Sequence, residues 1–325
     1  MDILLYSPED QDALATGLAQ ALPEAIIHVW QEPGTTKPDA SGSSESIGEA
    51  KALPPCDYAV LWAPPAQLFI GQDSLKAIFA LGAGVDSLMR CPGLPAEVPV
   101  IRIEDAGMAD QMIEYTLYAA LQRLRRFDQY RRFSATGQWQ ALPYTARKDI
   151  RIGVLGLGEL GRRVAGALAS FGFSVSAWSR SAKQVDGILC RHGPDGLDAV
   201  LAASDVLVVL LPLTEATRGL LDHRALSLLP EGACLVNLAR GPIIVDADLL
   251  ALLETGHIGY AFLDVFTTEP LPPGHPYWGH PRVCVTPHVA AVIPPGESVA
   301  QISRKIRALE AGNKVSGVVD GGMGY

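Results

Sequence analysis

Three polar residues in the second half of the chain follow apolar, strand-like runs and could act together on one substrate. Arg240 ends the run "VNLAR", Glu269 lies in "LDVFTTEPLP" and His288 lies in "VTPHVA". In a parallel α/β sheet, ligands gather at the carboxyl ends of the strands. The positions of these three residues therefore predict one shared catalytic site.

The three residue types suit the reduction of a 2-keto acid. The guanidinium of Arg240 can hold a carboxylate by two parallel hydrogen bonds and polarise the neighbouring carbonyl. When hydride reaches the carbonyl carbon, the oxygen becomes alkoxide-like, and an imidazole such as that of His288 can supply its proton. A carboxylate from Glu269 beside the imidazole would favour the protonated ring and fix its orientation.

The segment "RIGVLGLGELGRRVAGAL" predicts the source of the hydride. Gly156, Gly158 and Gly161 have G-x-G-x-x-G spacing, with an apolar strand before them and an alanine-rich amphipathic segment after them. The first two glycines allow a tight turn against a pyrophosphate, and the third allows close packing of helix on strand. The helix N-terminus stabilises the negative charge. This context favours dinucleotide binding over an ordinary glycine-rich turn.

The stretch "SAWSRS" ends the next predicted strand, where NAD-preferring enzymes usually place an acidic residue. Here the chain has Ser179, Arg180 and Ser181, which could bind the 2′-phosphate of NADP by charge-assisted hydrogen bonds. Lys183 adds positive charge nearby. We therefore expect NADPH to be preferred over NADH, with a surface Arg180 stacked on adenine as the alternative.

Apolar, β-branched runs alternate with amphipathic segments, a pattern typical of parallel sheets covered on both faces. We expect an α/β protein with two doubly wound parallel-sheet domains. The first is a discontinuous substrate-binding (lid) domain over 1–104 and 289–325; the second is a Rossmann domain over 105–288. A helix over 107–133 is expected to link the two domains, and another helix is expected near 296–312. The predicted strands are 2–7, 25–30, 58–63, 76–81 and 98–103 in the lid domain, and 151–156, 173–178, 205–211, 233–238, 259–265 and 282–287 in the Rossmann domain.

Composition narrows the possible partners. A net charge of −9 argues against binding to nucleic acid or to an anionic membrane surface. The five cysteines lack metal-like or redox-motif spacing, which indicates a reducing compartment, and we expect a cytoplasmic protein without a resident metal. The stretch 31–50 is rich in Gly, Ser, Pro and Thr and is predicted to be an exposed loop or mobile insertion.

Several motifs, in this order, resemble the D-isomer-specific 2-hydroxyacid dehydrogenases: "GLGELG", "LLPLTEATRGLL", "NLARG", "LDVFTTEPLP" and "TPHVA". The segments "LWAPP", "FALGAGVDSL", "EDAGMADQMIEY", "RRFDQYR", "WSRS" and "MGY" are similar to the glyoxylate/hydroxypyruvate reductase A group of that family. The resemblance covers the chain apart from 31–50. It implies a flavodoxin-like lid domain beside the Rossmann domain.

The resemblance also implies site residues beyond the three named first. Main-chain amides of the lid residues Leu81, Gly82, Ala83 and Gly84 would wrap the substrate carboxylate, and Trp62 would wall the pocket. Asp264 would meet the nicotinamide side of the cofactor. The other implied cofactor contacts are Glu159, Leu160, Leu211, Pro212, Thr217, Leu238 and Ala239. A homodimer formed across the cofactor domains is implied too, with Trp139 reaching the partner's pocket.

The resulting interpretation is an NADPH-dependent reductase that converts glyoxylate to glycolate or hydroxypyruvate to D-glycerate. A related dehydrogenase acting on D-lactate, an aromatic 2-keto acid or phosphoglycerate is the main alternative. A dinucleotide-sensing, corepressor-like binding protein is an alternative from another class, because such proteins share the fold and the Arg, Glu and His positions. They usually carry long partner-binding tails, which we do not expect here.

Overall fold

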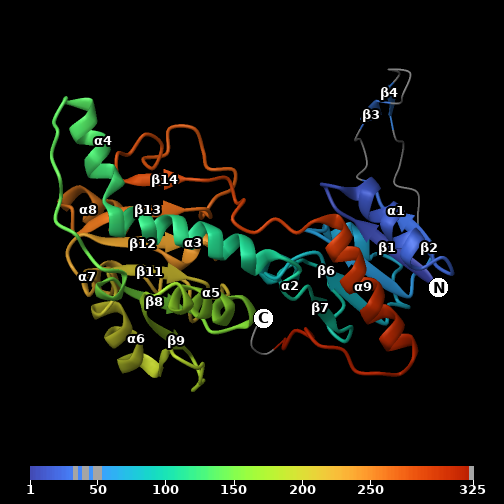
Figure 1. The fold of residues 1–325 in the computed structure, drawn as a ribbon. Helices are drawn as coiled ribbons and strands as arrows, with labels where there is room; N and C mark the ends of the chain where they lie inside the picture. The colour runs from blue at the N-terminus through green and yellow to red at the C-terminus, as the bar shows by residue number, and fades with distance from the viewer. Residues whose placement is uncertain (32–35, 39–43, 47–52, 322–325) are drawn as a thin grey trace. The chain divides into compact units, whose positions relative to one another are not determined.

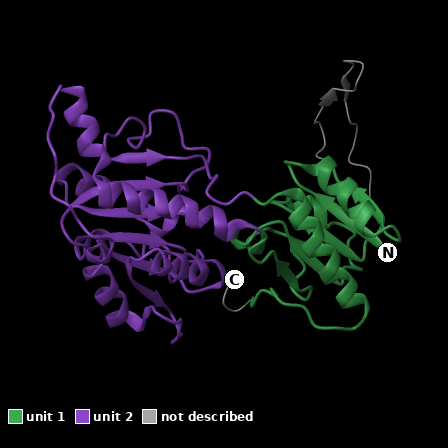
Figure 2. Ribbon diagram, in the orientation of Figure 1, with its two compact units in different colours: residues 1–106, 293–325 green, residues 107–292 purple. Residues whose placement is uncertain are grey.

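Two parallel β-sheets organise the chain, each in a unit of its own. A computed structural model describes residues 1–31, 36–38, 44–46 and 53–321. Unit 1 comprises Met1–Ala106 with Ile293–Tyr325, and unit 2 comprises Gly107–Val292 (Figure 2). Sequence patterns placed these boundaries after residues 104 and 288. The predicted α/β class with two parallel sheets is confirmed.

Unit 2 contains the larger sheet, with parallel strands in the order β10-β9-β8-β11-β12-β13-β14 (Figure 1). The chain enters at β8, proceeds outward through β9 and β10, and returns to the other side of β8 with β11. This reversal creates a switch point between β8 and β11, where α/β sheets bind ligands. The strands are β8 (Arg151–Leu155), β9 (Ser174–Ser179), β10 (Leu189–His192), β11 (Val206–Val209), β12 (Ala233–Asn237), β13 (Ile258–Leu263) and β14 (Val283–Val285).

Successive side chains of the central strands point to opposite faces of this sheet, and helices cover both faces. Val206 and Val208 of β11 belong to a core that includes α3 and α5, whereas Leu207 and Val209 belong to a core that includes α6, α7 and α8. The helices are α3 (Met108–Arg125), α4 (Phe127–Ala135), α5 (Glu159–Ser170), α6 (Gly193–Ala202), α7 (His223–Ser227) and α8 (Asp246–Thr255), with 3₁₀ turns η2 (Arg147–Asp149) and η3 (Gly241–Ile243).

Unit 1 contains a five-stranded parallel sheet in the order β2-β1-β5-β6-β7. Its core consists of buried apolar residues from these strands, among them Leu4, Ala59 and Ile78. The strands are β1 (Asp2–Tyr6), β2 (Ile26–Val29), β5 (Tyr58–Leu61), β6 (Ala77–Ala80) and β7 (Val100–Arg102). The helices are α1 (Gln11–Ala21), α2 (Asp86–Met89) and α9 (Pro295–Glu310), with a 3₁₀ turn η1 (Ala66–Phe69).

The single helix predicted over 107–133 is wrong, because the chain breaks it at Arg126. Arg126 adopts the left-handed conformation, with φ 54°, and its amide bonds to the carbonyl of Gln122. The buried stripe of α3 ends at Leu124, and α4 has no buried residue. Because α4 buries no side chain against the sheet, packing does not require it to continue the direction of α3. The chain can therefore change direction at Arg126, although this residue is neither Gly nor Pro.

Three short strands, β10 and the pair β3 and β4, were not predicted from the sequence patterns. The edge strand β10 pairs only with β9 and is largely exposed, so it has no apolar run to mark it. Within 31–50, β3 (Thr36–Pro38) and β4 (Ser44–Ser46) form an antiparallel pair where a loop was predicted. The remainder of that predicted insertion, apart from Gln31, lies outside the described residues.

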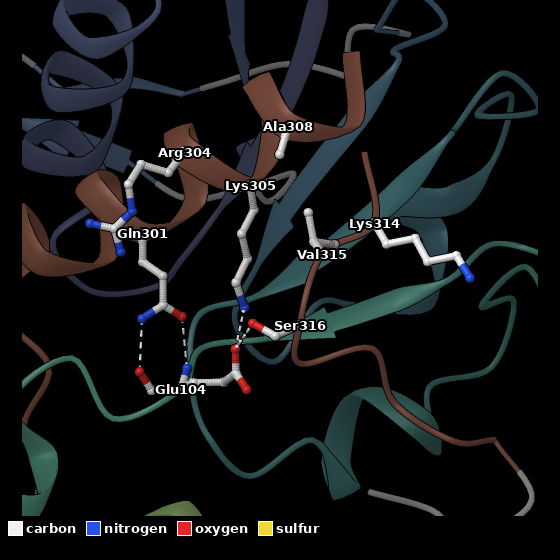
Figure 3. A pocket seen from close by; sticks show the side chains of 8 residues that line it. All are labelled: Glu104, Gln301, Arg304, Lys305, Ala308, Lys314, Val315 and Ser316. Atoms are coloured by element: carbon white, nitrogen blue, oxygen red, sulfur yellow. Dashed lines mark hydrogen bonds and ion pairs between the residues drawn. The ribbon is translucent and has the colours of Figure 1, made fainter. Parts of the chain in front are cut away.

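Side chains of α9 bind the C-terminal part of unit 1 to its N-terminal part (Figure 3). Gln301 donates to the carbonyl of Glu104 at 2.8 Å and accepts from its amide at 2.7 Å. Lys305, largely buried, donates to the Glu104 carboxylate at 3.0 Å and to the Arg102 carbonyl at 3.1 Å. Ser316 also donates to this carboxylate. These residues line a recess of unit 1 that contains none of the predicted site residues.

In the part of the chain that the structure describes, no helix has the length and apolar character needed to cross a bilayer. The same residues contain no group of three or more His, Cys, Asp or Glu side chains that could hold a metal ion.

The Glu104–Lys305 pair leads to a prediction about stability. Burial favours the neutral form of Glu104, but hydrogen bonds from Ser316 and Lys305, together with the charges of Lys305 and Arg102, lower its pKa below the ordinary glutamate value. Glu104→Gln should lower the free energy of unfolding at neutral pH by about 1–3 kcal/mol, since it leaves a buried ammonium without its carboxylate. Urea denaturation measures this loss, with exposed Glu24→Gln as the control.

The sign of the pH dependence follows from the lowered pKa of Glu104. Its contribution is present above the pKa of the unfolded carboxyl and is lost as the pH falls through the folded pKa. The stability difference between wild type and Glu104→Gln should therefore shrink on acidification. A difference that grows at low pH would contradict this assignment.

Candidate active site

Glu269 and His288 form a hydrogen-bonded pair beyond the carboxyl ends of β13 and β14. His288 Nδ1 lies 2.7 Å from Glu269 Oε2, and Glu269 Oε1 accepts from the amide of Phe266 at 2.8 Å. The side chain of His288 is 42% exposed and that of Glu269 is 33% exposed, so solvent and ligands can reach the imidazole. An ionised Glu269 makes Nδ1 the donor, which leaves Nε2 as the nitrogen that can exchange a proton with a ligand.

The pair favours an ionised carboxylate. Burial opposes ionisation of Glu269, but hydrogen bonds from His288 and from the Phe266 amide, with the charges of His288 and Arg240, lower its pKa below the ordinary value. A carboxylate that stays negative beside an imidazole stabilises the imidazolium.

Arg240 follows the neighbouring strand β12, and a tight backbone turn sets its position. Asn237, only 1% exposed, accepts from the amide of Ala239 at 3.1 Å and donates to the carbonyl of Arg240 at 3.1 Å. A Cβ on Gly241 would lie 1.9 Å from the carbonyl carbon of Phe266. Only glycine lets the Arg240 turn approach the segment that leads to Glu269 this closely.

Asp264 holds the backbone around His288 in place. The Asp264 carboxylate is 1% exposed and accepts hydrogen bonds from the amides of Val289 and Ala290, both at 2.9 Å. Its carbonyl accepts from the amide of His288, whose φ of 55° is unusual for a residue other than glycine. The predicted contact of Asp264 with nicotinamide remains a prediction, since the structure shows its carboxylate bonded within the chain.

The three glycines after β8 have the geometry that a dinucleotide requires. Gly156 has φ 107°, and a Cβ there would lie 2.5 Å from the carbonyl oxygen of Leu210. A Cβ on Gly161 would lie 1.9 Å from the Gly156 oxygen, whereas one on Gly158 would meet no described atom within 4 Å. Open space therefore remains at the N-terminus of α5, where Glu159 begins the helix. Anions bind at such helix ends, so these residues fit a pyrophosphate.

The "SAWSRS" turn lies beside this glycine turn. The amide of Gly156 donates to the carbonyl of Trp178 at 2.8 Å, and Lys183 Nζ donates to the carbonyl of Leu157 at 2.8 Å. Arg180 and Ser181 are exposed directly after β9. Ser179 is buried, and its hydroxyl proton is used in a 2.8 Å bond to the Ser181 carbonyl. The exposed hydrogen-bond donors of this turn are therefore those of Arg180 and Ser181.

Other predicted cofactor contacts lie at the ends of the neighbouring strands. The hydroxyl of Thr217 donates to the carbonyl of Pro212 at 2.7 Å and accepts from the amide of Thr214, so it shapes the turn after β11. Three more of the predicted contacts are buried apolar residues beside this edge of the sheet: Leu211, Leu238 and Ala239. Leu160 belongs to the first turn of α5. Their contacts with a cofactor stay predictions.

The predicted substrate residues of unit 1 lie side by side. A Cβ on Gly82 would lie 2.4 Å from Cζ3 of Trp62, so the absence of a side chain lets the indole pack on the turn after β6. The amides of Ala83 and Gly84 have no hydrogen-bond partner within the described part of the chain. Leu81 anchors the turn by bonding to the carbonyl of Leu61 at 2.9 Å. Paired amides of this kind can bind a carboxylate.

Comparison with known proteins identifies the family. A family model described as the D-isomer specific 2-hydroxyacid dehydrogenase, NAD binding domain, matches residues 117–290. The chain is also 43% identical over 331 aligned residues to glyoxylate/hydroxypyruvate reductase A of Serratia proteamaculans (strain 568), with 100% of both chains covered. The chain belongs to the D-isomer specific 2-hydroxyacid dehydrogenase family. It is an NAD(P)-dependent oxidoreductase.

Solved structures of the family agree with this fold. A D-isomer specific 2-hydroxyacid dehydrogenase from Xanthobacter autotrophicus Py2, in complex with NADPH and MES, matches with a TM-score of 0.88 and 38% identity, covering 100% of this chain and 99% of that one. The NADPH-dependent glyoxylate/hydroxypyruvate reductase from Sinorhizobium meliloti, in complex with NADP and sulfate, matches with a TM-score of 0.88 and 34% identity over the same shares.

Sequence reasoning missed two residues that shape the site of this dehydrogenase. Asn237 is a polar residue inside the buried run "ACLVN", and a polar residue in such a strand could have indicated a structural hydrogen bond. Gly241 follows Arg240 directly, but only the close approach to Phe266 explains why it lacks a side chain.

The dehydrogenase carries two glycines on α5 whose substitution should have opposite effects. Gly161→Ala would drive a methyl group into the Gly156 carbonyl, so we expect it to cost about 1–3 kcal/mol of stability and to weaken NADPH binding about tenfold or more. Gly166→Ala meets no described atom within 4 Å and should stabilise the helix by roughly 0.5–1 kcal/mol. Urea denaturation and fluorescence titration with NADPH measure both effects. Equal behaviour of the two variants would contradict the proposed turn geometry.

Proposed function

We propose that this dehydrogenase is an NADPH-dependent reductase of small 2-keto acids, converting glyoxylate to glycolate and hydroxypyruvate to D-glycerate. The observation that carries the proposal is the 2.7 Å pairing of His288 Nδ1 with Glu269 at the sheet edge that also bears Arg240. The names of the Serratia proteamaculans and Sinorhizobium meliloti relatives support this choice of substrates.

The proposed roles follow from the chemistry of each side chain. A nicotinamide cofactor, when bound, would supply the hydride for the substrate carbonyl. The guanidinium of Arg240 binds the 2-keto acid and polarises its carbonyl oxygen. His288 is the general acid, and its Nε2 gives a proton to the oxygen as negative charge develops there. Glu269 orients the ring through Nδ1 and stabilises the imidazolium before transfer.

Main-chain amides of unit 1 are proposed to bind the substrate carboxylate. The amides of Ala83 and Gly84, which lack partners among the described residues, support this role. Trp62 packs on Gly82 and would supply an apolar wall beside them.

NADPH is proposed as the preferred cofactor because of the residues that follow β9. Arg180 and Ser181 are exposed where NAD-preferring enzymes carry an acid, and no carboxylate in "SAWSRS" would repel a 2′-phosphate. The hydrogen bond from Gly156 to Trp178 holds this turn against the glycine turn. The NADPH and NADP complexes of two relatives support the same preference.

We propose that the enzyme functions as a homodimer through the surface formed by α4 and the segment after it. No residue of α4 is buried within the chain. Trp139 is 102% exposed and Tyr144 is 88% exposed, with Phe127 also exposed nearby in the sequence. Exposed apolar groups of this size usually mark an interface. We assign Trp139 to the partner's substrate site.

His288 is the residue that tests the proposed function most directly. Wild-type enzyme should oxidise NADPH rapidly with glyoxylate or hydroxypyruvate, and His288→Ala should lower kcat by about a hundredfold or more, because the proton donor is gone. Steady-state absorbance assays measure both, and exposed His223→Ala is the matched control. A wild-type enzyme that reduces neither acid would overturn the proposed substrates, and a fully active His288→Ala would remove His288 from the mechanism.

Arg180 tests the proposed cofactor preference. Arg180→Ala should weaken NADPH binding by about 10–100-fold, the effect of losing a hydrogen bond to a charged group, while NADH binding changes little. Fluorescence titration with each cofactor gives the two dissociation constants. Arg191→Ala on the neighbouring strand β10 removes the same charge from an exposed position and serves as the control. Equal losses for both cofactors in Arg180→Ala would show that Arg180 does not bind the 2′-phosphate.

A further inference from the structure

One face of α3 contacts the segment that carries His288 at two points. Gln111 and Tyr115 are four residues apart, so their side chains lie on the same side of the helix. Tyr115 contacts Thr286, before His288 in the chain, and Gln111 contacts Val292, after it. The catalytic scheme above uses none of these residues.

The contact at Tyr115 forms a directed chain of hydrogen bonds. Thr286 Oγ1 lies 2.6 Å from Asp264 Oδ1, and a carboxylate can only accept, so Thr286 donates its single proton there. Tyr115 Oη lies 2.8 Å from Thr286 Oγ1 and must therefore be the donor to it. Burial raises the pKa of Tyr115 above the ordinary tyrosine value, which keeps this proton in place at any pH of assay.

Asp264 connects that chain to the backbone of the catalytic histidine. Its carboxylate also accepts from the amides of Val289 and Ala290, and its carbonyl accepts from the amide of His288. A φ of 55° is unusual for a residue other than glycine and persists only where the surroundings enforce it. The hydrogen bonds from the amides of His288, Val289 and Ala290 to Asp264 hold the His288 backbone in this conformation.

The contact at Gln111 holds the other end of the segment. Its side-chain amide accepts from the amide of Val292 at 3.0 Å and donates to the carbonyl of Val292 at 2.7 Å. This double hydrogen bond satisfies both backbone groups of one residue, so it fixes the segment in position and direction. The backbone between Thr286 and Val292 is thereby held at both ends by one helix.

We propose that Tyr115 and Gln111 are positioning residues that align His288 for proton transfer, Tyr115 acting through Thr286 and Asp264. The inference rests on the proposed role of His288 as general acid. Proton transfer depends steeply on donor geometry, and a displacement of about 1 Å can cost up to a hundredfold in rate. Loosening either contact should therefore slow catalysis without removing any group that touches the substrate.

The test uses Tyr115→Phe in the full-length enzyme, assayed with NADPH and hydroxypyruvate. We expect kcat to fall about tenfold, while KM and the dissociation constant of NADPH stay within about twofold, because only the alignment of the proton donor changes. The solvent deuterium isotope effect on kcat should rise, since proton transfer becomes slower relative to other steps. Tyr118→Phe is the matched control, because this tyrosine of α3 is exposed.

Variants of Thr286 and Gln111 separate positioning from simple loss of stability. Thr286→Val keeps the shape but loses the hydroxyl, and should reproduce the Tyr115→Phe defect, whereas Thr286→Ser should restore kcat. The double variant Tyr115→Phe/Thr286→Val should be no slower than either single variant, because both break one chain. Gln111→Glu keeps an acceptor for Val292 but cannot donate to it, and should also lower kcat at unchanged KM.

Each outcome bears on the proposal. Normal kcat in Tyr115→Phe, or losses that multiply in the double variant, would overturn it. A fall in kcat without a larger solvent isotope effect would also overturn it, because a lower fraction of folded enzyme explains that result. If the wild-type enzyme reduces neither acid, the proposed function itself fails; if His288→Ala remains fully active, His288 is not the general acid and the positioning role fails with it; if His288→Ala is inactive and Tyr115→Phe is normal, only the positioning role fails.

Discussion

The hydrogen bonds to the buried carboxylate of Asp264 are the interactions on which the arrangement of the candidate active site in unit 2 depends. They join three parts of the chain: Asp264 itself, directly after β13, the segment after β14, which donates to it, and α3, which reaches it through Thr286. The backbone amide of Asp264 also bonds to the carbonyl of Asn237 at the end of β12. Arg240 and His288 are thus supported by one connected set of hydrogen bonds.

Close backbone approach is the second constraint, and it acts at two turns. Gly241 brings the Arg240 turn against Phe266, and Gly161 brings the first turn of α5 against Gly156. Each contact leaves less than the room that a methyl group requires. The turn that carries Arg240 and the glycine turn before α5 therefore share a physical requirement, which is that strand ends and turns pack backbone to backbone.

The hydrogen bond between Glu269 and His288 couples a carboxylate to an imidazole at this edge of the sheet. A carboxylate that is partly buried would ordinarily resist ionisation, yet the neighbouring imidazole, the Phe266 amide and Arg240 keep its pKa low. The ionised carboxylate therefore accepts from His288 Nδ1 and fixes the orientation of the ring. Arg240 contributes in two ways, by its charge near Glu269 and by its capacity to bind a carboxylate.

The sequence by itself determined the fold class, the strands of both parallel sheets apart from β10, the glycine turn and the polar residues at three strand ends. Those features depend on local patterns: apolar runs, helix periodicity and residue types at fixed spacing. Only the tertiary structure decided that Arg126 breaks the predicted helix, that the Ser179 hydroxyl is used inside its own turn, and that α3 holds the His288 segment. Tyr115 and Thr286 are 171 positions apart, so no local pattern relates them. Their contact exists because a parallel sheet brings the end of β14 beneath a helix that precedes the first strand of its unit.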